Sequence, residues 1–203
     1  NGLRGGYLNR HWEDTVRWCL DEAKRFELDV YLYDELHYPS GPAGDLIFEA
    51  FPDTAMESLE LAWEGTVAPG SQADPQEELD VVLISHPDGR TEEISTPWHN
   101  ETERQVYALG FSVRRQREHP DYLDAEVMKA FVRLSYTWYA ERFGNWMGSV
   151  IKGEFTDNAC ANFGHFRRSI PWTSAMQEKF RAQTGLDLKT VLPSLFIETA
   201  SSH

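Results

Sequence analysis

The sequence predicts an α/β fold, a partial (β/α)8 TIM-type barrel with a small antiparallel β insertion. Two apolar, β-prone runs, residues 28–33 and 150–155, each end in carboxylates and a polar loop. Helix-like segments precede both runs, and a region of alternating hydrophobicity separates them. A buried strand whose C-terminal tip opens into a polar loop is typical of parallel barrels and open α/β sheets. Two such strands cannot close an eight-stranded barrel, so either the remaining strands lie outside this chain or the sheet is open.

The charge and composition exclude several classes of partner. The 203 residues carry a net charge of −14, which disfavours binding to nucleic acid and to anionic membranes. No apolar run approaches the roughly 20 residues that a membrane helix needs. The chain begins with neither an initiator Met nor a signal sequence. We therefore expect a segment of a longer protein, whose compartment the sequence leaves open.

Residues 1–53 form the first predicted part of the barrel. Asn9 is a candidate N-cap for a helix over residues 10–26. The apolar positions of this segment recur at helical spacing and predict its buried stripe: Val16, Cys19, Leu20, Ala23 and Phe26. The strand 28–33 follows after a short connection, which is typical of α/β units.

Residues 54–118 form the predicted antiparallel insertion. Leu59, Leu61 and Trp63 alternate with polar residues, as in a strand with one buried face. Residues 81–84 form a short apolar run, and residues 107–113 alternate again. The sequence His-Pro-Asp-Gly at 86–89 predicts a turn, because Pro fixes φ and Gly closes the turn.

Residues 119–203 continue the predicted barrel. Asp124 is a candidate N-cap for a helix that ends near Gly144, and the strand 150–155 follows. Ser174 and Gln177 have the spacing of a capping box for a further helix, which Gly185 would end. A last short helix is predicted over 188–196, entered or broken near its proline.

The period of two along each strand predicts which side chains face the open end of the sheet. Leu28, Val30 and Leu32 would pack beneath helices, leaving Tyr31, Tyr33 and Glu35 on the other face. In the second strand Ile151 and Phe155 would face helices, leaving four residues inward: Lys152, Glu154, Thr156 and Asn158. Glu35 and Asn158 then occupy equivalent tip positions. Asp34 and Asp157 would point aside and hold loops. Glu154 would lie about 13 Å deeper than Asn158 at ~3.3 Å per residue, which suits an internal ion pair with Lys152 or another barrel residue better than contact with a substrate.

Each candidate has a functional and a structural interpretation. Glu35 could act as a general acid, base or nucleophile, or its carboxylate could cap a helix or accept hydrogen bonds from the turn Ser40-Gly41. His37 could bind a metal or a sugar hydroxyl, or be an ordinary loop histidine. Trp172 could stack on a sugar ring, or pack as a hydrophobic staple at a helix entry.

The residues at the ends of the two predicted strands, together with motifs elsewhere in the chain, resemble those of a known family. The motifs occur in order along nearly the whole chain: Tyr33-Asp34-Glu35, Tyr38-Pro39-Ser40-Gly41, Ala43-Gly44, His119-Pro120-Asp121-Tyr122-Leu123, Gly153-Glu154-Phe155-Thr156-Asp157, Pro171-Trp172-Thr173 and Gly185-Leu186-Asp187-Leu188. They resemble the family 106 α-L-rhamnosidases, bacterial glycoside hydrolases with a (β/α)8 barrel. The resemblance implies a carbohydrate substrate, further barrel strands and β domains in the same longer protein, and a secreted or periplasmic location.

The resemblance also implies roles for individual residues. Glu35 and Asp157 would be the catalytic carboxylates, whereas Asp34 and Glu154 would be structural. The substrate-binding residues would be Tyr33, His37, Tyr38, Ser40, Asn158 and Trp172. Members of this family can use a calcium ion on oxygen ligands, to which Asp34 or Asp157 could contribute, although no calcium-loop motif or other metal site is evident. One position departs from the family pattern: Asn158 stands where a glutamate is usual, and an amide neither donates a proton to a leaving group nor acts as a base.

Three functional hypotheses follow, in order of preference. The first is a segment of a glycoside hydrolase, and the second is a carbohydrate-binding homologue that does not catalyse hydrolysis. The third is a metal-dependent hydrolase that uses Asp34, His37, Asp157 and His165.

Overall fold

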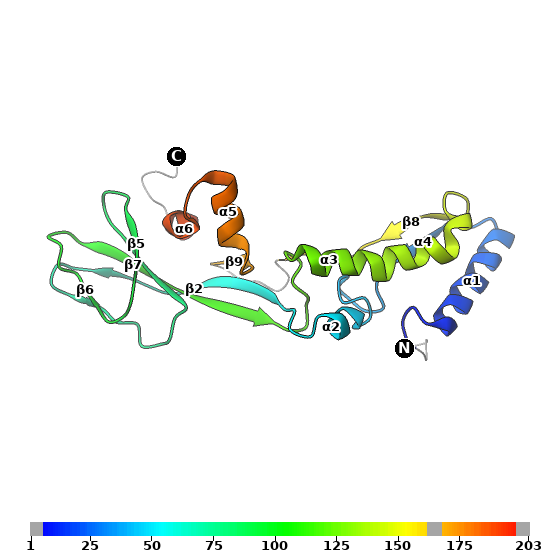
Figure 1. The fold of residues 1–203 in the computed structure, drawn as a ribbon, viewed down its shortest axis with the longest axis horizontal. Helices are drawn as coiled ribbons and strands as arrows, with labels where there is room; N and C mark the ends of the chain where they lie inside the picture. The colour runs from blue at the N-terminus through cyan, green and yellow to red at the C-terminus, as the bar shows by residue number, and fades with distance from the viewer. Residues whose placement is uncertain (1–5, 162–167, 198–203) are drawn as a thin grey trace. The chain divides into compact units, whose positions relative to one another are not determined.

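The computed structural model describes residues 6–161 and 168–197, which fall into two compact units (Figure 1). Unit 1 comprises Asn1–Met56 and Gln116–Phe163, and unit 2 comprises Glu57–Arg115 and Gly164–His203. The predicted domain range 119–203 therefore has residues in both units.

Unit 1 contains the predicted helix–strand pairs. Its first part holds α1 (Arg10–Arg25), β1 (Val30–Tyr33) and α2 (Leu46–Ala50). Its second part holds α3 (Ala125–Val132), the π-helical turn η1 (Arg133–Thr137), α4 (Trp138–Phe143), the 3-10 turn η2 (Gly144–Trp146) and β8 (Ile151–Phe155). The predicted N-caps are confirmed, since the Asn9 side chain accepts from Trp12 N and the Asp124 side chain accepts from Glu126 N.

The core of unit 1 lies between the strand pair and the helices. β1 and β8 pair in parallel as a two-stranded sheet. Leu32 and Ile151 from these strands are buried in one cluster with Leu20 of α1, Phe131 of α3 and Tyr139 of α4.

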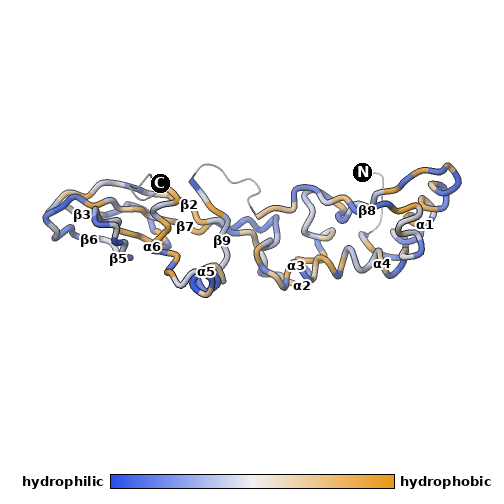
Figure 2. Tube along the Cα trace, turned by 90° about the horizontal axis from the view of Figure 1, so that it is seen from above, coloured by the Kyte–Doolittle hydropathy of each residue, from blue (hydrophilic) through white to orange (hydrophobic). Residues whose placement is uncertain are grey.

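Unit 2 is built on an antiparallel sheet of five strands in the order β5-β4-β7-β2-β9. These strands are β2 (Met56–Val67), β4 (Val81–Ser85), β5 (Thr91–Ile94), β7 (Val106–Gln116) and β9 (Ser169–Trp172). A second small sheet pairs β3 (Gln72–Ala73) with β6 (Trp98–His99). The antiparallel strands predicted within 54–118 are therefore present, and Figure 2 shows the hydrophobic residues of β7 in orange.

Two helices complete unit 2, α5 (Met176–Thr184) and α6 (Leu188–Phe196). Gly185 ends α5 with φ 74°, as predicted, and the Asp187 side chain caps α6. The predicted capping box at Ser174 is wrong, because α5 begins after Ala175 without a side-chain cap. Pro193 neither starts nor breaks α6, which continues through it.

The predicted TIM-type barrel is wrong. Among the described residues only β1 and β8 pair in parallel, the five-stranded sheet is antiparallel, and no sheet closes on itself. The physical reason is that most strands come from the alternating region, where short connections join neighbouring strands and favour antiparallel pairing. β9, which the sequence did not predict, adds to this same sheet at β2. No helix in the described part of the chain combines the length and apolar character needed to cross a membrane.

Candidate functional site

The ends of β1 and β8 lie side by side, as the sequence predicted. Tyr33 pairs with Phe155 at the last position of the ladder, and Asp34 N donates to the Phe155 carbonyl at 3.3 Å. Each strand is followed by the polar loop that the sequence motifs predicted. The loop after β1 and the loop after β8 therefore meet at one edge of the two-stranded sheet.

The predicted faces of β8 are wrong, however. The pairing register slips by one residue between Val30, opposite Ile151, and Tyr31, opposite Gly153. This irregularity reverses the alternation of β8 beyond Ile151. Glu154 consequently lies on the buried face, opposite Leu32, whereas Phe155 lies beside Tyr33 on the other face, with ring centroids 5.9 Å apart.

Asp34 ties three segments of unit 1 together. Its carboxylate is fully buried and accepts hydrogen bonds from the hydroxyls of Ser40 at 2.6 Å, Tyr136 at 2.7 Å and Thr156 at 2.6 Å. Its backbone carbonyl accepts from the Ser135 hydroxyl at 2.9 Å. These bonds connect the end of β1 with η1 and with the loop after β8, so Asp34 holds the loops in place.

Glu35 is only 2% exposed, and both of its carboxylate oxygens accept hydrogen bonds from backbone N–H groups. Oε1 accepts from Leu36 N at 2.8 Å and Gly44 N at 2.5 Å, and Oε2 accepts from Gly41 N at 3.3 Å and Ala43 N at 2.5 Å. Burial raises the pKa of Glu35, and the backbone hydrogen bonds oppose that rise. The geometry favours the structural interpretation, because Glu35 could not exchange a proton with a substrate without releasing the loop.

The two loops are joined at their tips. Ser40 N donates to the Asp157 carbonyl at 2.9 Å, and Asp157 N donates to the Ser40 hydroxyl at 3.0 Å. The Asn158 amide donates to the Tyr38 hydroxyl. Tyr38 is 55% exposed, Asn158 is exposed, and Asp157 is half-buried. This tip is the part of the predicted site that is open to a ligand.

The remaining predicted site residues lie in different surroundings. His37 is exposed, and its carbonyl accepts from the Tyr33 hydroxyl at 2.7 Å. Trp172 belongs to unit 2, where it is half-buried on β9 opposite Glu57 and packs against the core of the sheet. His165 lies outside the described residues.

Glu154 has an electrostatic environment that sequence reasoning missed. Its Oε1 atom is buried without a hydrogen-bond partner, and burial, aided by the negative charge of Asp34, raises its pKa to about 7. The predicted ion pair with Lys152 is wrong, since Lys152 Nζ lies 3.7 Å from Asp29 Oδ1. The signal that could have located this polar layer is the pair Ser135 and Tyr136, two hydroxyl residues within an otherwise amphipathic helix.

No group of three or more His, Cys, Asp or Glu side chains that could hold a metal ion occurs among residues 6–161 and 168–197. Asp34, one predicted ligand, already accepts three hydroxyl hydrogen bonds. Burial raises the pKa of Tyr33, and the negative charge of Asp157 also contributes to this rise.

Comparison with protein-family models, curated proteins and solved structures gives no match for this chain. The resemblance to the family 106 α-L-rhamnosidases is therefore neither supported nor contradicted.

Proposed function

We propose that the joined loops of unit 1 bind a carbohydrate and that the chain is part of a glycoside hydrolase. The single observation that carries this proposal is the contact between the two loops, in which the Asn158 amide meets the Tyr38 hydroxyl beside Asp157. An amide, a phenol and a carboxylate at one open edge offer both donors and acceptors to sugar hydroxyls.

Aromatic side chains near the tip add a surface for a sugar ring. Tyr33 and Phe155 lie together on the face of the strand pair that points away from the polar layer, and Phe155 is 55% exposed. Tyr31 on the same face is 67% exposed. An aromatic ring presents an apolar face against which the C–H groups of a sugar can pack.

Asp157 is the carboxylate that we assign to the chemistry. Glycoside hydrolysis ordinarily uses two carboxyl groups, one as acid and one as base or nucleophile. Glu35 is held by the loop, which leaves Asp157, half-buried at the tip, as the other predicted catalytic residue. The second carboxyl group is not assigned to a described residue.

Carbohydrate binding without hydrolysis is the second candidate, and two specific observations favour it. Both oxygens of Glu35 are engaged by backbone N–H groups, and the second tip position is an amide, Asn158, rather than a carboxylate. Such a site would retain hydrogen bonding to a sugar but would lack an acid–base pair.

Turnover of 4-nitrophenyl glycosides and binding of methyl glycosides separate the two candidates. We expect hydrolysis that Asp157→Asn abolishes and that Asp45→Asn, a change of an exposed carboxylate in the same unit, leaves intact. Binding without release, lost in Asn158→Gly, would establish the second candidate; glycine tolerates the positive φ of 49° at this position. The absence of both binding and release would refute both candidates.

A further inference from the structure

A cavity of about 560 Å³ lies within unit 2, between the end of its sheet and α6. Its walls come from the β4–β5 hairpin, the start of β7, the end of β2 and α6. Figure 1 shows α6 in red beside the strands, and α6 contacts both β4 and β5. The volume falls in the range of sites for small molecules.

The sheet surface that faces α6 changes character at this cavity. Leu83 and Leu109 are opposite one another on β4 and β7 and pack with Leu188 and Leu192 of α6. Two residues further along β4, the next row on the same face consists of hydroxyls: Thr91, Ser85 and Tyr107, aligned across β5, β4 and β7. The sheet thus ends in a polar row where its apolar packing stops.

The helix presents a matching polar pair. Thr190 and Ser194 are four residues apart, so they lie on one side of α6, and both line the cavity. The Thr190 hydroxyl donates to the Asp187 carbonyl and the Ser194 hydroxyl donates to the Val191 carbonyl, each at 2.7 Å. A hydroxyl has one proton, so these two oxygens offer lone pairs to a ligand.

Two of the three sheet hydroxyls, those of Thr91 and Tyr107, donate their protons within the protein in the same way. Thr91 donates to the Thr190 carbonyl at 3.3 Å, and Tyr107 donates to Glu64 at 2.5 Å. The cavity therefore presents acceptors from both walls, and neither Lys nor Arg is among its lining residues. A phosphate or carboxylate ligand would find no cationic side chain there, whereas a ligand rich in hydroxyl donors would be well satisfied.

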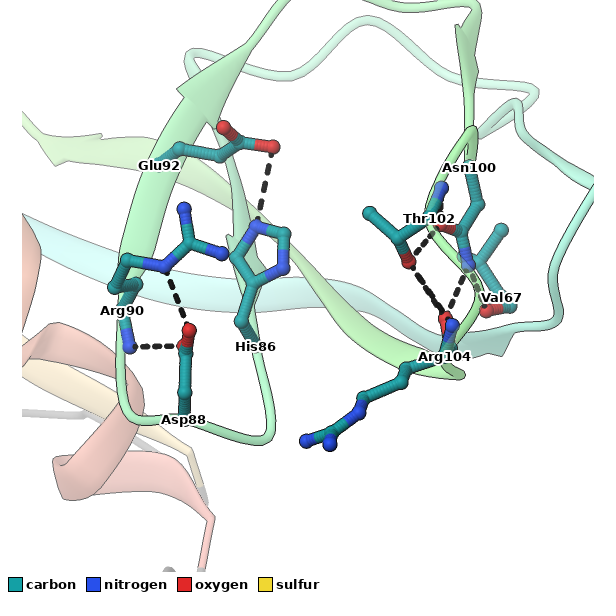
Figure 3. A network of polar contacts seen from close by, with 8 residues as sticks. All are labelled: Val67, His86, Asp88, Arg90, Glu92, Asn100, Thr102 and Arg104. Carbon is teal, nitrogen blue, oxygen red and sulfur yellow. Dashed lines mark hydrogen bonds and ion pairs between the residues drawn. The ribbon is translucent and has the colours of Figure 1, made fainter.

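One buried side chain at the cavity is paired with an exposed carboxylate. His86 is only 9% exposed, and its Nε2 atom lies 3.2 Å from Glu92 Oε1 in an ion-pair contact (Figure 3). Buried polar atoms are nearly always paired, with protein, water or ligand, because an unpaired one costs free energy. Glu92 supplies that partner for His86, so the capacity of the cavity to bind a ligand rests on its hydroxyl rows.

Buried polar contacts fix the backbone on the far side of the cavity. Asn100 is fully buried, and its amide donates to the carbonyls of Val67 at 2.9 Å and Arg104 at 2.8 Å (Figure 3). Thr66 and Gln105, the neighbours of these two residues, line the cavity. The walls are therefore preorganised rather than formed by free loops.

We propose that this cavity is a binding site for a neutral polyhydroxylated ligand, namely a sugar ring. The hydroxyl rows accept hydrogen bonds from its OH groups, and the exposed ring of Pro87 packs against its C–H groups. The site lies in unit 2 and is independent of the proposed tip site in unit 1.

An NMR titration of the ¹⁵N-labelled full chain with methyl β-D-glucopyranoside and methyl α-L-rhamnopyranoside tests this inference. We expect amide shifts at residues 85–91 and 190–194 with at least one of these glycosides. Thr190→Val and Ser194→Ala remove one acceptor each, so each should weaken binding about tenfold, while Ser71→Ala, an exposed control, should have no effect.

Each alternative outcome has a clear meaning. Shifts confined to residues 38 and 157–158 would refute the cavity proposal and support the tip site. Shifts at the cavity with spermidine, a cationic ligand, but with neither glycoside would show that the acceptors bind amines, which also refutes it. Cavity shifts that Thr190→Val and Ser194→Ala leave unchanged, or no shifts with either glycoside, would overturn it as well.

Discussion

Glu35→Gln should destabilise unit 1 rather than only reduce an activity. The glutamate holds four backbone N–H groups of residues 36–44, and a glutamine would present its NH₂ group to some of these donors. Each charge-assisted hydrogen bond contributes about 1.5–3 kcal/mol, and an unpaired buried donor costs about 1–3 kcal/mol. Relief of the burial that raises the Glu35 pKa offsets part of this loss. We expect a net loss of about 2–4 kcal/mol in the free energy of unfolding.

Urea unfolding and amide hydrogen exchange measure this effect globally and locally. In the wild type, the amides of Ala43 and Gly44 should be protected, because both donate to Glu35. In Glu35→Gln their protection should fall by the same free energy. Glu49→Gln, a change of an exposed carboxylate on α2, provides the matched control and should alter neither measurement. A Glu35→Gln protein with wild-type stability and protection would show that the carboxylate does not hold this loop.

Three further predictions concern other buried groups. Burial and the charge of Asp34 raise the pKa of Glu154 from 4.5 to about 7. Protonation of this carboxyl group therefore stabilises the folded state fully below pH 4.5, and this contribution is lost as the pH rises through 7. Glu154→Gln should therefore stabilise the protein by about 1–2 kcal/mol at pH 8, after allowance for solvent screening, and have no effect at pH 4, as measured by urea unfolding. Asn100→Ala should lower the free energy of unfolding by about 2–4 kcal/mol in the same assay, because two buried carbonyl groups lose their hydrogen-bond donor. Gly41→Ala should lower the thermal midpoint, since a Cβ would lie 2.6 Å from the Tyr122 hydroxyl and φ is 142°.

Each of these predictions has a control and an opposing result. A stability difference for Glu154→Gln that is the same at pH 4 and pH 8 would remove the titration argument. Asn145→Ala, at an exposed position, should change stability by less than about 0.5 kcal/mol, and an equally small effect of Asn100→Ala would contradict its role. Gly144→Ala meets open space, so a thermal midpoint for Gly41→Ala as high as that of Gly144→Ala would refute the steric argument.

Local features of both units could be predicted from the sequence because they depend on neighbouring residues. The caps at Asn9 and Asp124 and the helix stop at Gly185 each rest on backbone geometry within one turn. The adjacency of the two strand ends also followed, because polar residues after two apolar strands indicate a common edge. The antiparallel sheet followed from alternation within 54–118.

The overall architecture could not be read in the same way. Two βα-like segments are compatible with a barrel, an open sheet or a two-stranded parallel sheet, and no feature of the sequence distinguishes between these arrangements. The contribution of β9 to the antiparallel sheet depends on pairing with β2, more than 100 residues earlier in the chain. Proline is disfavoured inside a sheet because it lacks an N–H donor, and Pro171 is tolerated in β9 because this strand lies at the edge.

The register slip in β1–β8 explains why the candidate site was only partly predicted. A period-two count places Glu154 and Phe155 correctly only if pairing is regular, and one irregular step exchanges their faces. The exchange brings Glu154 to Asp34 beneath η1, where its pKa rises, and leaves Phe155 exposed beside the tip. Glu35, by contrast, was given an open position because no sequence pattern reveals that the N–H groups of residues 36–44 converge on its carboxylate. The chemistry of unit 1 therefore depends on backbone geometry that brings three carboxylates into distinct environments: Asp34 bonded by hydroxyls, Glu35 by amides, and Glu154 with one oxygen unpaired.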